Sequence, residues 1–207
     1  MDLMTQEVTQ QTGMIRVFVG PMGAGKTTAL LNWYGVTGMM DVRTMLVKHD
    51  DGAAEHPLVL ETHAGTRVVA DAVVGDCDLL RAVYGVFDLS KPGRTAVFID
   101  EGHFYANLPN VVETMALNGT DVFVAALDCD SARHPFQNIA ELCARADVVD
   151  KMHGTCDRCS KASQYSYRRK KAPPQTAQCS VGGFDVYGAL CRHCYREFVD
   201  GATGVEC

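Results

Sequence analysis

Short apolar runs rich in β-branched residues alternate along the chain with segments whose apolar positions repeat at helical spacing. The apolar runs, each typical of a buried strand, cover residues 15–19, 44–47, 96–99, 122–127 and 148–149. The segments with helical spacing cover residues 28–34, 71–83, 111–118 and 137–146. Alternation of this kind predicts an α/β fold, with a parallel sheet and helices on both faces. Such sheets bind ligands beyond the carboxyl ends of their strands, so the chemistry is expected there.

A glycine-rich segment joins the first predicted strand to the first predicted helix. It reads Gly20-Pro21-Met22-Gly23-Ala24-Gly25-Lys26-Thr27 and fits the G-x-x-x-x-G-K-[ST] pattern of phosphate-binding loops. The glycines let backbone N–H groups surround a polyphosphate, Lys26 can reach the β- and γ-phosphates, and the Thr27 hydroxyl can bind Mg²⁺. The alternative is a glycine-rich turn with an unrelated lysine. The strand before the segment and the helix after it favour the phosphate-binding interpretation.

Two carboxylates follow the apolar run at residues 96–99. Asp100 is placed to hold the Mg²⁺ shell, directly or through water, and Glu101 to take a proton from a nucleophile. A strand that merely ends in two solvated acids is the alternative. The phosphate-binding loop upstream favours the catalytic interpretation.

Four cysteines near the C-terminus have the spacing of metal ligands. Cys156-x-x-Cys159 and Cys191-x-x-Cys194 predict a closed tetrahedral Zn²⁺ site, although the interval between the two pairs is longer than in most zinc ribbons. Free buried thiols are the alternative. A closed site offers no vacant coordination position, so the zinc is expected to be structural.

The pattern changes after Met152, where cysteines become frequent and periodic segments rare. We therefore predict a polar tail at residues 1–13, a nucleotide-binding α/β domain at 14–152, a zinc-binding domain at 153–195 and a C-terminal tail at 196–207. The basic run from Arg168 to Lys171, with two prolines after it, is typical of an exposed loop.

Composition narrows the class of function. A chain of 207 residues with 47% hydrophobic content can form one sizeable core and a small added module. A formal net charge of −6 argues against a protein whose main task is to coat nucleic acid. Residues 1–13 lack the features of a secretory signal and no apolar run is long enough to cross a bilayer, so a cytoplasmic protein is expected. Nine cysteines without an export signal favour reduced thiols or metal ligands over disulfides.

The motifs as a set resemble those of the type II thymidine kinases, the cellular and poxviral type of deoxynucleoside kinase. The matching segments extend from about residue 14 to 195: residues 20–27, Ile99-Asp100-Glu101-Gly102-x-Phe104, Ala125-Ala126-Leu127-Asp128, Pro135-Phe136, both cysteine pairs, Gly182-Gly183 and Tyr187. The resemblance implies a RecA-like sheet and transfer of a phosphoryl group from ATP, with Mg²⁺, to the 5′-hydroxyl of thymidine. It also implies a cytosolic homotetramer, inhibition by dTTP and no nucleic-acid partner.

The resemblance assigns roles to individual residues. Glu101 would be the general base, and Asp100 and His103 would join residues 20–27 at the ATP site. The segment between the cysteine pairs resembles the lasso with which the family covers the nucleoside. The nucleoside-binding set that the resemblance implies is Met22, Phe104, Leu127, Ser131, Ser166, Gln178, Cys179, Ser180, Val181, Gly182 and Tyr187.

The chain departs from the family pattern in several places, one of which is the loop at residues 50–54, where a basic residue found in many members is missing. His103 stands where the family usually has Gln, which keeps hydrogen-bonding capacity but adds a group that titrates near neutrality. Ser131 stands where the family has a base-stacking Phe, and Cys129-Asp130 replace the usual Gly-Thr. Stacking on a base contributes about 1–3 kcal/mol, so its loss predicts weaker thymidine binding or relaxed specificity.

The sequence therefore predicts a thymidine kinase, with two alternatives open. Ser131 motivates a deoxynucleoside kinase with a different base preference. The zinc motif and the short basic run motivate an ATPase that binds nucleic acid. A kinase turns over ATP in proportion to a nucleoside acceptor, whereas the ATPase would respond to DNA or RNA.

Overall fold

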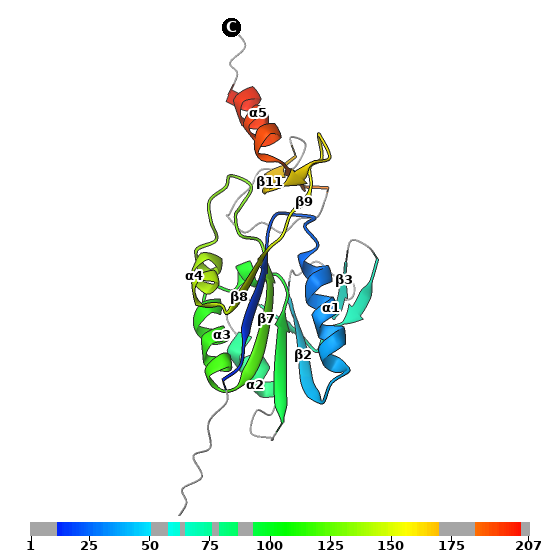
Figure 1. The fold of residues 1–207 in the computed structure, drawn as a ribbon, viewed down its shortest axis with the longest axis vertical. Coiled ribbons are helices and arrows are strands. Elements are labelled where there is room, and N and C mark those ends of the chain that lie inside the picture. Colours follow the sequence, from blue (N-terminus) through cyan, green and yellow to red (C-terminus); the bar gives the residue numbers. More distant parts are fainter. Residues whose placement is uncertain are drawn as a thin grey trace, which may run out of the picture.

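A six-stranded parallel sheet forms the centre of the molecule (Figure 1). The computed structural model describes residues 12–50, 58–62, 65–75, 79–86, 93–169 and 185–203. The strand order is β5-β2-β6-β7-β1-β8. The strands are β1 Ile15–Val19, β2 Val42–His49, β5 Ala72–Val74, β6 Arg94–Ile99, β7 Thr120–Ala126 and β8 Val148–Lys151. The predicted α/β class is thus confirmed, and each predicted strand overlaps an observed one.

Helices cover both faces of this sheet because successive side chains of a strand point to opposite sides. Val17 and Val19 of β1 face a core shared with α2 Leu79–Val86, α3 Leu108–Leu117 and α4 Gln137–Arg145. Phe18 faces the second core, which α1 Lys26–Gly38 covers together with the hairpin of β3 Val59–Glu61 and β4 Arg67–Val69. In Figure 1, α1 lies on one side of the sheet and α3 and α4 on the other.

The parallel register brings the carboxyl ends of the strands to one edge. Val19 pairs with Ala126, and Val47 pairs with Ile99. The segments that leave the sheet there begin at residues 20, 100, 127 and 152, and they contain most of the predicted site residues. The fold therefore gathers motifs that lie far apart in the sequence.

The predicted helix at residues 71–83 is wrong in its first half. Ala72–Val74 form β5, which pairs with β2, and the helix begins only at Leu79. Asp71 anchors this edge strand, because its carboxylate accepts the N–H of Leu46 at 2.7 Å while its own N–H donates to the Leu46 carbonyl at 2.8 Å. Two consecutive valines also favour extended backbone, and this preference outweighs the apparent helical spacing.

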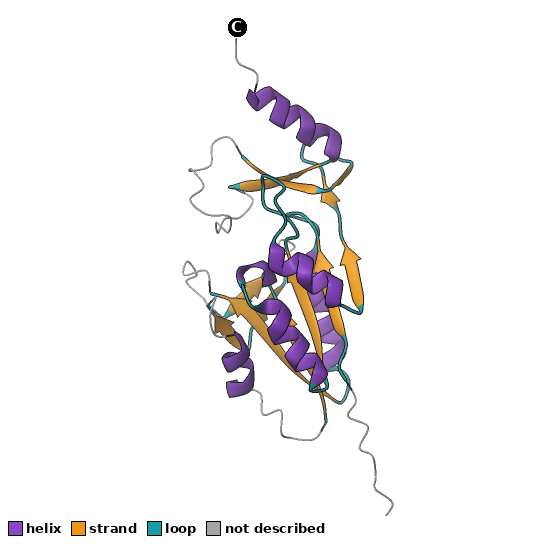
Figure 2. Ribbon diagram, turned by 90° about the vertical axis from the view of Figure 1, so that its left-hand side faces the viewer, coloured by secondary structure: helices purple, strands orange, loops and turns teal. Residues whose placement is uncertain are grey.

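A second, smaller module lies beyond the carboxyl edge of the sheet (Figure 2). It contains the pairs β9 Gly154–Thr155 with β10 Ala162–Ser163 and β11 Tyr165–Arg168 with β12 Tyr187–Leu190, followed by α5 Arg192–Thr203. The expected C-terminal tail is helical as far as residue 203, and the predicted boundary at 195 falls inside α5. Tyr195 and Phe198 explain this difference, since residues three apart share a helix face and both pack on the module's core.

Within the described parts of the chain, no helix combines the length and apolar character that crossing a bilayer requires.

Candidate active site and metal centre

The glycine-rich loop has the backbone conformation that the motif requires. Gly23 and Gly25 have φ values of 68° and 80°, in the left-handed region that favours glycine. A Cβ on Gly20 would lie 2.4 Å from the Met152 carbonyl oxygen, so the loop can approach β8 only with glycine there. Helix α1 begins at Lys26 and directs its N-terminal dipole at the loop. Together these features form a cradle suited to an anion.

Lys26 is buried within this cradle. Its ammonium donates to the Pro21 carbonyl oxygen at 2.8 Å. Burial lowers the pKa of Lys26, and the nearby Glu101 and Asp100 carboxylates act in the opposite direction. The loop lysine and the two acids after β6 therefore belong to one electrostatic unit.

Thr27 and Asp100 meet as the sequence predicts. The Thr27 hydroxyl donates to Oδ1 of Asp100 at 3.0 Å and lies 3.3 Å from Oδ2. Burial raises the pKa of Asp100 to about 6, although this hydrogen bond opposes the shift. A hydroxyl and a carboxylate side by side next to a phosphate cradle are oxygen ligands of the kind that Mg²⁺ binds, so the donor set fits the expected ion.

Glu101 combines a strained backbone with a perturbed carboxyl group. Its φ of 54° and ψ of 41° are left-handed, a conformation that costs a non-glycine residue about 1–3 kcal/mol and is common at functional sites. Desolvation by the surrounding protein, followed by the charge of Asp100, raises the pKa of Glu101 to about 7. About 45% of the side chain remains exposed. The carboxyl group is therefore exposed enough for a substrate to reach it, and its pKa lies in the range suited to a general base.

A side chain of α4 stabilises the turn that follows Glu101. This turn forms the short 3₁₀ helix η1 Gly102–Phe104. Asn138, in the first turn of α4, directs its side-chain nitrogen at the carbonyl oxygens of Gly102, His103 and Tyr105, at 3.4, 3.2 and 2.9 Å. Asn138 was not predicted from the sequence, where it is marked only as a polar residue two positions after Phe136 of the Pro135-Phe136 motif.

His103 is buried and neutral. Burial, followed by the charges of Lys26 and His49, lowers the pKa of His103 to about 3, which corrects the expectation of titration near neutrality. Its Nδ1 accepts the N–H of Leu127 at 3.4 Å and lies 3.4 Å from Oε2 of Glu101. A neutral imidazole offers one acceptor and one donor, as a glutamine amide does. The substitution thus keeps hydrogen-bonding capacity without adding a charge.

Phe104, one of the predicted nucleoside-binding residues, is packed against two imidazole rings. The His49 ring stacks on it with centroids 4.3 Å apart and an interplanar angle of 16°. The His103 ring lies 4.4 Å away at 33°. His49 ends β2 and is buried, and it belongs to no motif that would have identified it. These contacts fix the orientation of the Phe104 ring.

The structure brings together some of the predicted nucleoside-binding residues. The backbone N–H of Met22 donates to the Ser166 hydroxyl at 3.0 Å, and Leu127 contacts His103 as described above. Ser131 is joined to the small module, because its carbonyl oxygen accepts the Tyr195 hydroxyl at 2.8 Å. Tyr187 is buried in β12, and its hydroxyl accepts from Arg168 at 3.1 Å. Gln178, Cys179, Ser180, Val181 and Gly182 lie outside the described residues.

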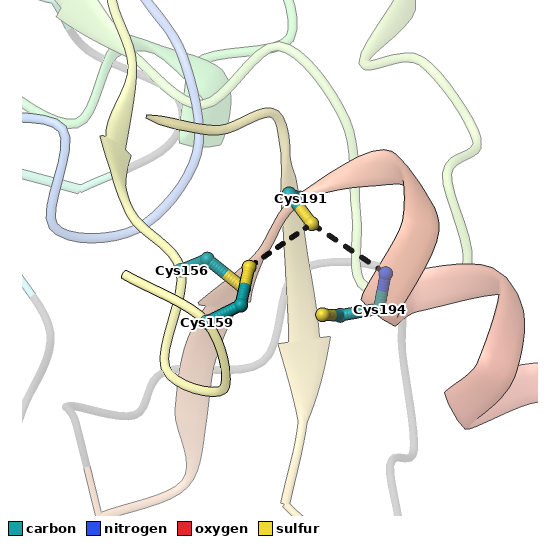
Figure 3. Close-up of side chains that lie close together, drawn as sticks. All are labelled: Cys156, Cys159, Cys191 and Cys194. Carbon is teal, nitrogen blue, oxygen red and sulfur yellow. Dashed lines mark hydrogen bonds between the residues drawn. The ribbon is translucent and has the colours of Figure 1, made fainter. Parts of the chain in front are cut away.

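The four predicted zinc ligands form one cluster (Figure 3). Their sulfur atoms all lie within 4.8 Å of one another, and those of Cys159 and Cys191 are 3.6 Å apart. Zn–S bonds of about 2.3 Å in a tetrahedron place sulfurs about 3.8 Å apart, so the cluster fits Zn²⁺. The N–H of Cys194 also points at the Cys191 sulfur, 3.5 Å away, which favours the thiolate that binds metal.

Comparison with known proteins agrees with this arrangement. The family described as thymidine kinase matches residues 13–195 of the chain. The thymidine kinase of monkeypox virus is 32% identical over 183 residues, which cover 88% of this chain and 97% of the relative. The thymidine kinases of variola virus and of vaccinia virus strain Western Reserve are 32% and 31% identical over the same shares of the chains.

Proposed function

This chain belongs to the thymidine kinase family, and from that premise we propose that it transfers the γ-phosphoryl group of ATP to the 5′-hydroxyl of thymidine. The product would be dTMP, made by salvage for DNA synthesis. One observation carries the proposal: the phosphate cradle, the Thr27–Asp100 pair and the accessible Glu101 carboxyl group occur together at the carboxyl edge of the sheet.

Glu101 is the proposed general base. With its pKa near 7, it accepts a proton readily from a bound hydroxyl at physiological pH and returns it to solvent. The left-handed backbone of Glu101, and the turn that Asn138 holds, keep the carboxyl group in place during this transfer. Phosphoryl transfer depends mainly on positioning and charge stabilisation, so a well-placed base next to the phosphate cradle is the expected arrangement.

The residues of the loop bind the nucleotide. Backbone N–H groups of residues 20–27 and the N-terminus of α1 would surround the phosphates, and the Lys26 ammonium would leave Pro21 to pair with them. Thr27 and Asp100 would hold Mg²⁺, which when bound neutralises phosphate charge.

The nucleoside would lie between Phe104 and the segment after β7. Met22, Leu127 and Ser166 are proposed to enclose the pyrimidine 5-substituent, and the contact between Met22 and Ser166 supports this assignment for those two residues. Residues 178–182 are proposed, from the family resemblance alone, to contact the base. His103 is proposed, from the family resemblance, to contact ATP as a neutral hydrogen-bonding group.

A phosphorylation assay with ATP and Mg²⁺ tests the proposal. Thymidine, deoxycytidine, deoxyadenosine and deoxyguanosine serve as acceptors, and single-stranded DNA and RNA are added in separate reactions. Formation of dTMP with the highest kcat/KM is the expected result. A higher kcat/KM for another nucleoside would favour the altered base preference that Ser131 motivates. ATP hydrolysis stimulated by nucleic acid, with no phosphorylated nucleoside, would favour the ATPase.

The family resemblance also leads us to propose a cytoplasmic homotetramer that dTTP inhibits. Light scattering after gel filtration measures the assembly, and titration of dTTP into the kinase assay measures the inhibition.

A further inference from the structure

The loop between β7 and α4 is stabilised by hydrogen bonds among its own residues. We call residues 128–136 the Ser131 loop. The Asp130 carboxylate accepts the N–H groups of Ala132 and His134 at 2.9 and 2.8 Å. Cys129 pairs with Pro135 in an isolated bridge, and the Phe136 N–H donates to the Asp128 carbonyl at 3.0 Å. A loop closed by so many of its own hydrogen bonds is expected to move as a unit, so its position depends on the ion pair between Asp128 and Lys151 of β8 and on the surface against which it packs.

That surface is the small module. The Tyr195 hydroxyl donates to the Ser131 carbonyl oxygen at 2.8 Å. The Arg133 guanidinium lies 5.0 Å from the centroid of the Tyr195 ring and 5.6 Å from that of Tyr165, within the range of cation–π attraction. The two tyrosine rings are themselves 5.1 Å apart. The loop thus packs on an aromatic pair through one hydrogen bond and one cation.

Tyr195 is connected directly to the metal cluster. It follows Cys194 in the sequence, and its N–H donates to the Cys191 carbonyl at 2.9 Å. Both cysteines belong to the four-sulfur cluster, and the Tyr195 ring packs in the same small core as Cys156 and Leu190. Because this core is small, the metal is expected to supply much of what keeps the start of α5 in one position.

We propose that Tyr195 is a positioning residue through which zinc at the four-cysteine cluster sets the position of the Ser131 loop. Zinc fixes the start of α5, α5 fixes Tyr195, and the Tyr195 hydroxyl fixes the Ser131 backbone. The consequence for thymidine binding rests on the proposed function, because it requires that the Ser131 loop borders the nucleoside.

The test compares wild type with Tyr195→Phe, which keeps the ring and removes the hydroxyl. Zinc is measured first, and one equivalent per chain is expected in both proteins. In the zinc-loaded variant, amide hydrogen exchange across residues 127–137 should be about threefold to tenfold faster, as expected for one lost hydrogen bond. The KM for thymidine should rise by a similar factor, while kcat and the KM for ATP stay unchanged. Tyr84→Phe, which removes an exposed hydroxyl on α2, is the matched control.

Chelation supplies the second arm of the test. Removing zinc from wild type should speed exchange across residues 127–137, whereas removing it from Tyr195→Phe should have a smaller effect, because the hydroxyl contact is already lost and only the contact of Arg133 with the aromatic rings remains. Arg133→Gln, which removes the cation from the aromatic pair, should act in the same direction as Tyr195→Phe. Wild-type exchange in zinc-loaded Tyr195→Phe would overturn the proposal, as would equal effects of chelation on both proteins.

The exchange arm needs no nucleoside. If exchange responds as expected but wild type does not phosphorylate thymidine, the connection through Tyr195 stands and the proposed function fails. If thymidine is phosphorylated but exchange does not respond, the connection fails and the proposed function stands.

Discussion

At the scale of single residues, Glu101 is the group whose chemistry is most sensitive to its surroundings. Replacing it with Gln removes the proton acceptor and preserves the size of the side chain. Glu101→Gln should reduce kcat by roughly 10²- to 10⁴-fold, with little change in the KM for ATP. Steady-state kinetics with thymidine measure this, and Glu113→Gln on α3 is a control of the same chemistry. Turnover at the wild-type rate would remove Glu101 from the mechanism.

The raised pKa of Glu101 predicts a pH profile. A base works only when it is deprotonated, and the pKa here is about 7 against an ordinary 4.5. The kcat/KM for thymidine should therefore rise with pH about tenfold per unit below pH 7 and level off above it. Glu101→Gln should lack this limb. If kcat/KM instead falls with a midpoint near pH 4.5, the surroundings of Glu101 do not raise its pKa.

Ser131 tests the base pocket. Its carbonyl oxygen holds the Tyr195 hydroxyl, and a change of side chain leaves that bond in place. Ser131→Phe adds a stacking surface and should lower the KM for thymidine by up to about tenfold, equivalent to about 1.4 kcal/mol. Phe104→Ala should raise the KM. If neither change alters the KM for thymidine or deoxycytidine, the base is bound elsewhere.

Residues with a motif could be predicted from the sequence, and residues without one could not. Thr27, Asp100 and the four cysteines were identified by spacing, since a metal or phosphate demands fixed intervals along the chain. His49 stacks on Phe104, which lies 55 residues further along the chain, and Asn138 bonds to Gly102, 36 residues before it. No local sequence pattern records such long-range contacts. The strong downward pKa shift of His103 likewise depends on burial, which the sequence alone does not give.

At the scale of elements, Asn138 connects α4 to the turn that carries the active site. Replacing it with Ala removes its hydrogen bonds to the three carbonyl groups of residues 102, 103 and 105. Asn138→Ala should reduce the free energy of unfolding by about 1–3 kcal/mol and lower kcat, because η1 and the adjacent Glu101 lose their support. Denaturant unfolding and kinetics measure both effects. The control is the exposed Asn118 at the end of α3, whose side chain donates to the Thr114 carbonyl one turn earlier. Equal losses of stability and kcat in Asn118→Ala would refute the role of Asn138.

Two elements, β5 and α5, were not predicted because their residues also fit a different structure or role. Residues 72–74 continue the spacing of α2, but pairing with β2 and the anchor of Asp71 make them a strand. Helix α5 was not predicted because Cys194 was interpreted as a zinc ligand and residues 196–207 as a C-terminal tail. Once the cluster forms, Tyr195 and Phe198 share a helix face toward it.

At the scale of the whole molecule, the zinc cluster is the component whose removal should have the widest effect. One equivalent of zinc per chain is expected in protein purified without chelator, and Cys191→Ser should lose it. The free energy of unfolding of the small module should fall, while the sheet keeps its own core. Metal analysis and thermal unfolding measure this. The matched control is Cys143→Ser, a thiol on α4 outside the cluster, which should keep its zinc.

The position of β1 in the sheet has a consequence for how the protein is made. The strand leaves the ribosome well before its two partners, β7 and β8, so Ile15 waits for Val122 and Arg16 for Val148. Within the six-stranded sheet, β2, β5 and β6 can pair with one another before β7 is made. A prematurely terminated product that ends before β7 would therefore carry the complete phosphate-binding motif without either strand that holds it in place. The capacity to bind a nucleotide therefore arises only after β7 and β8 have been synthesised.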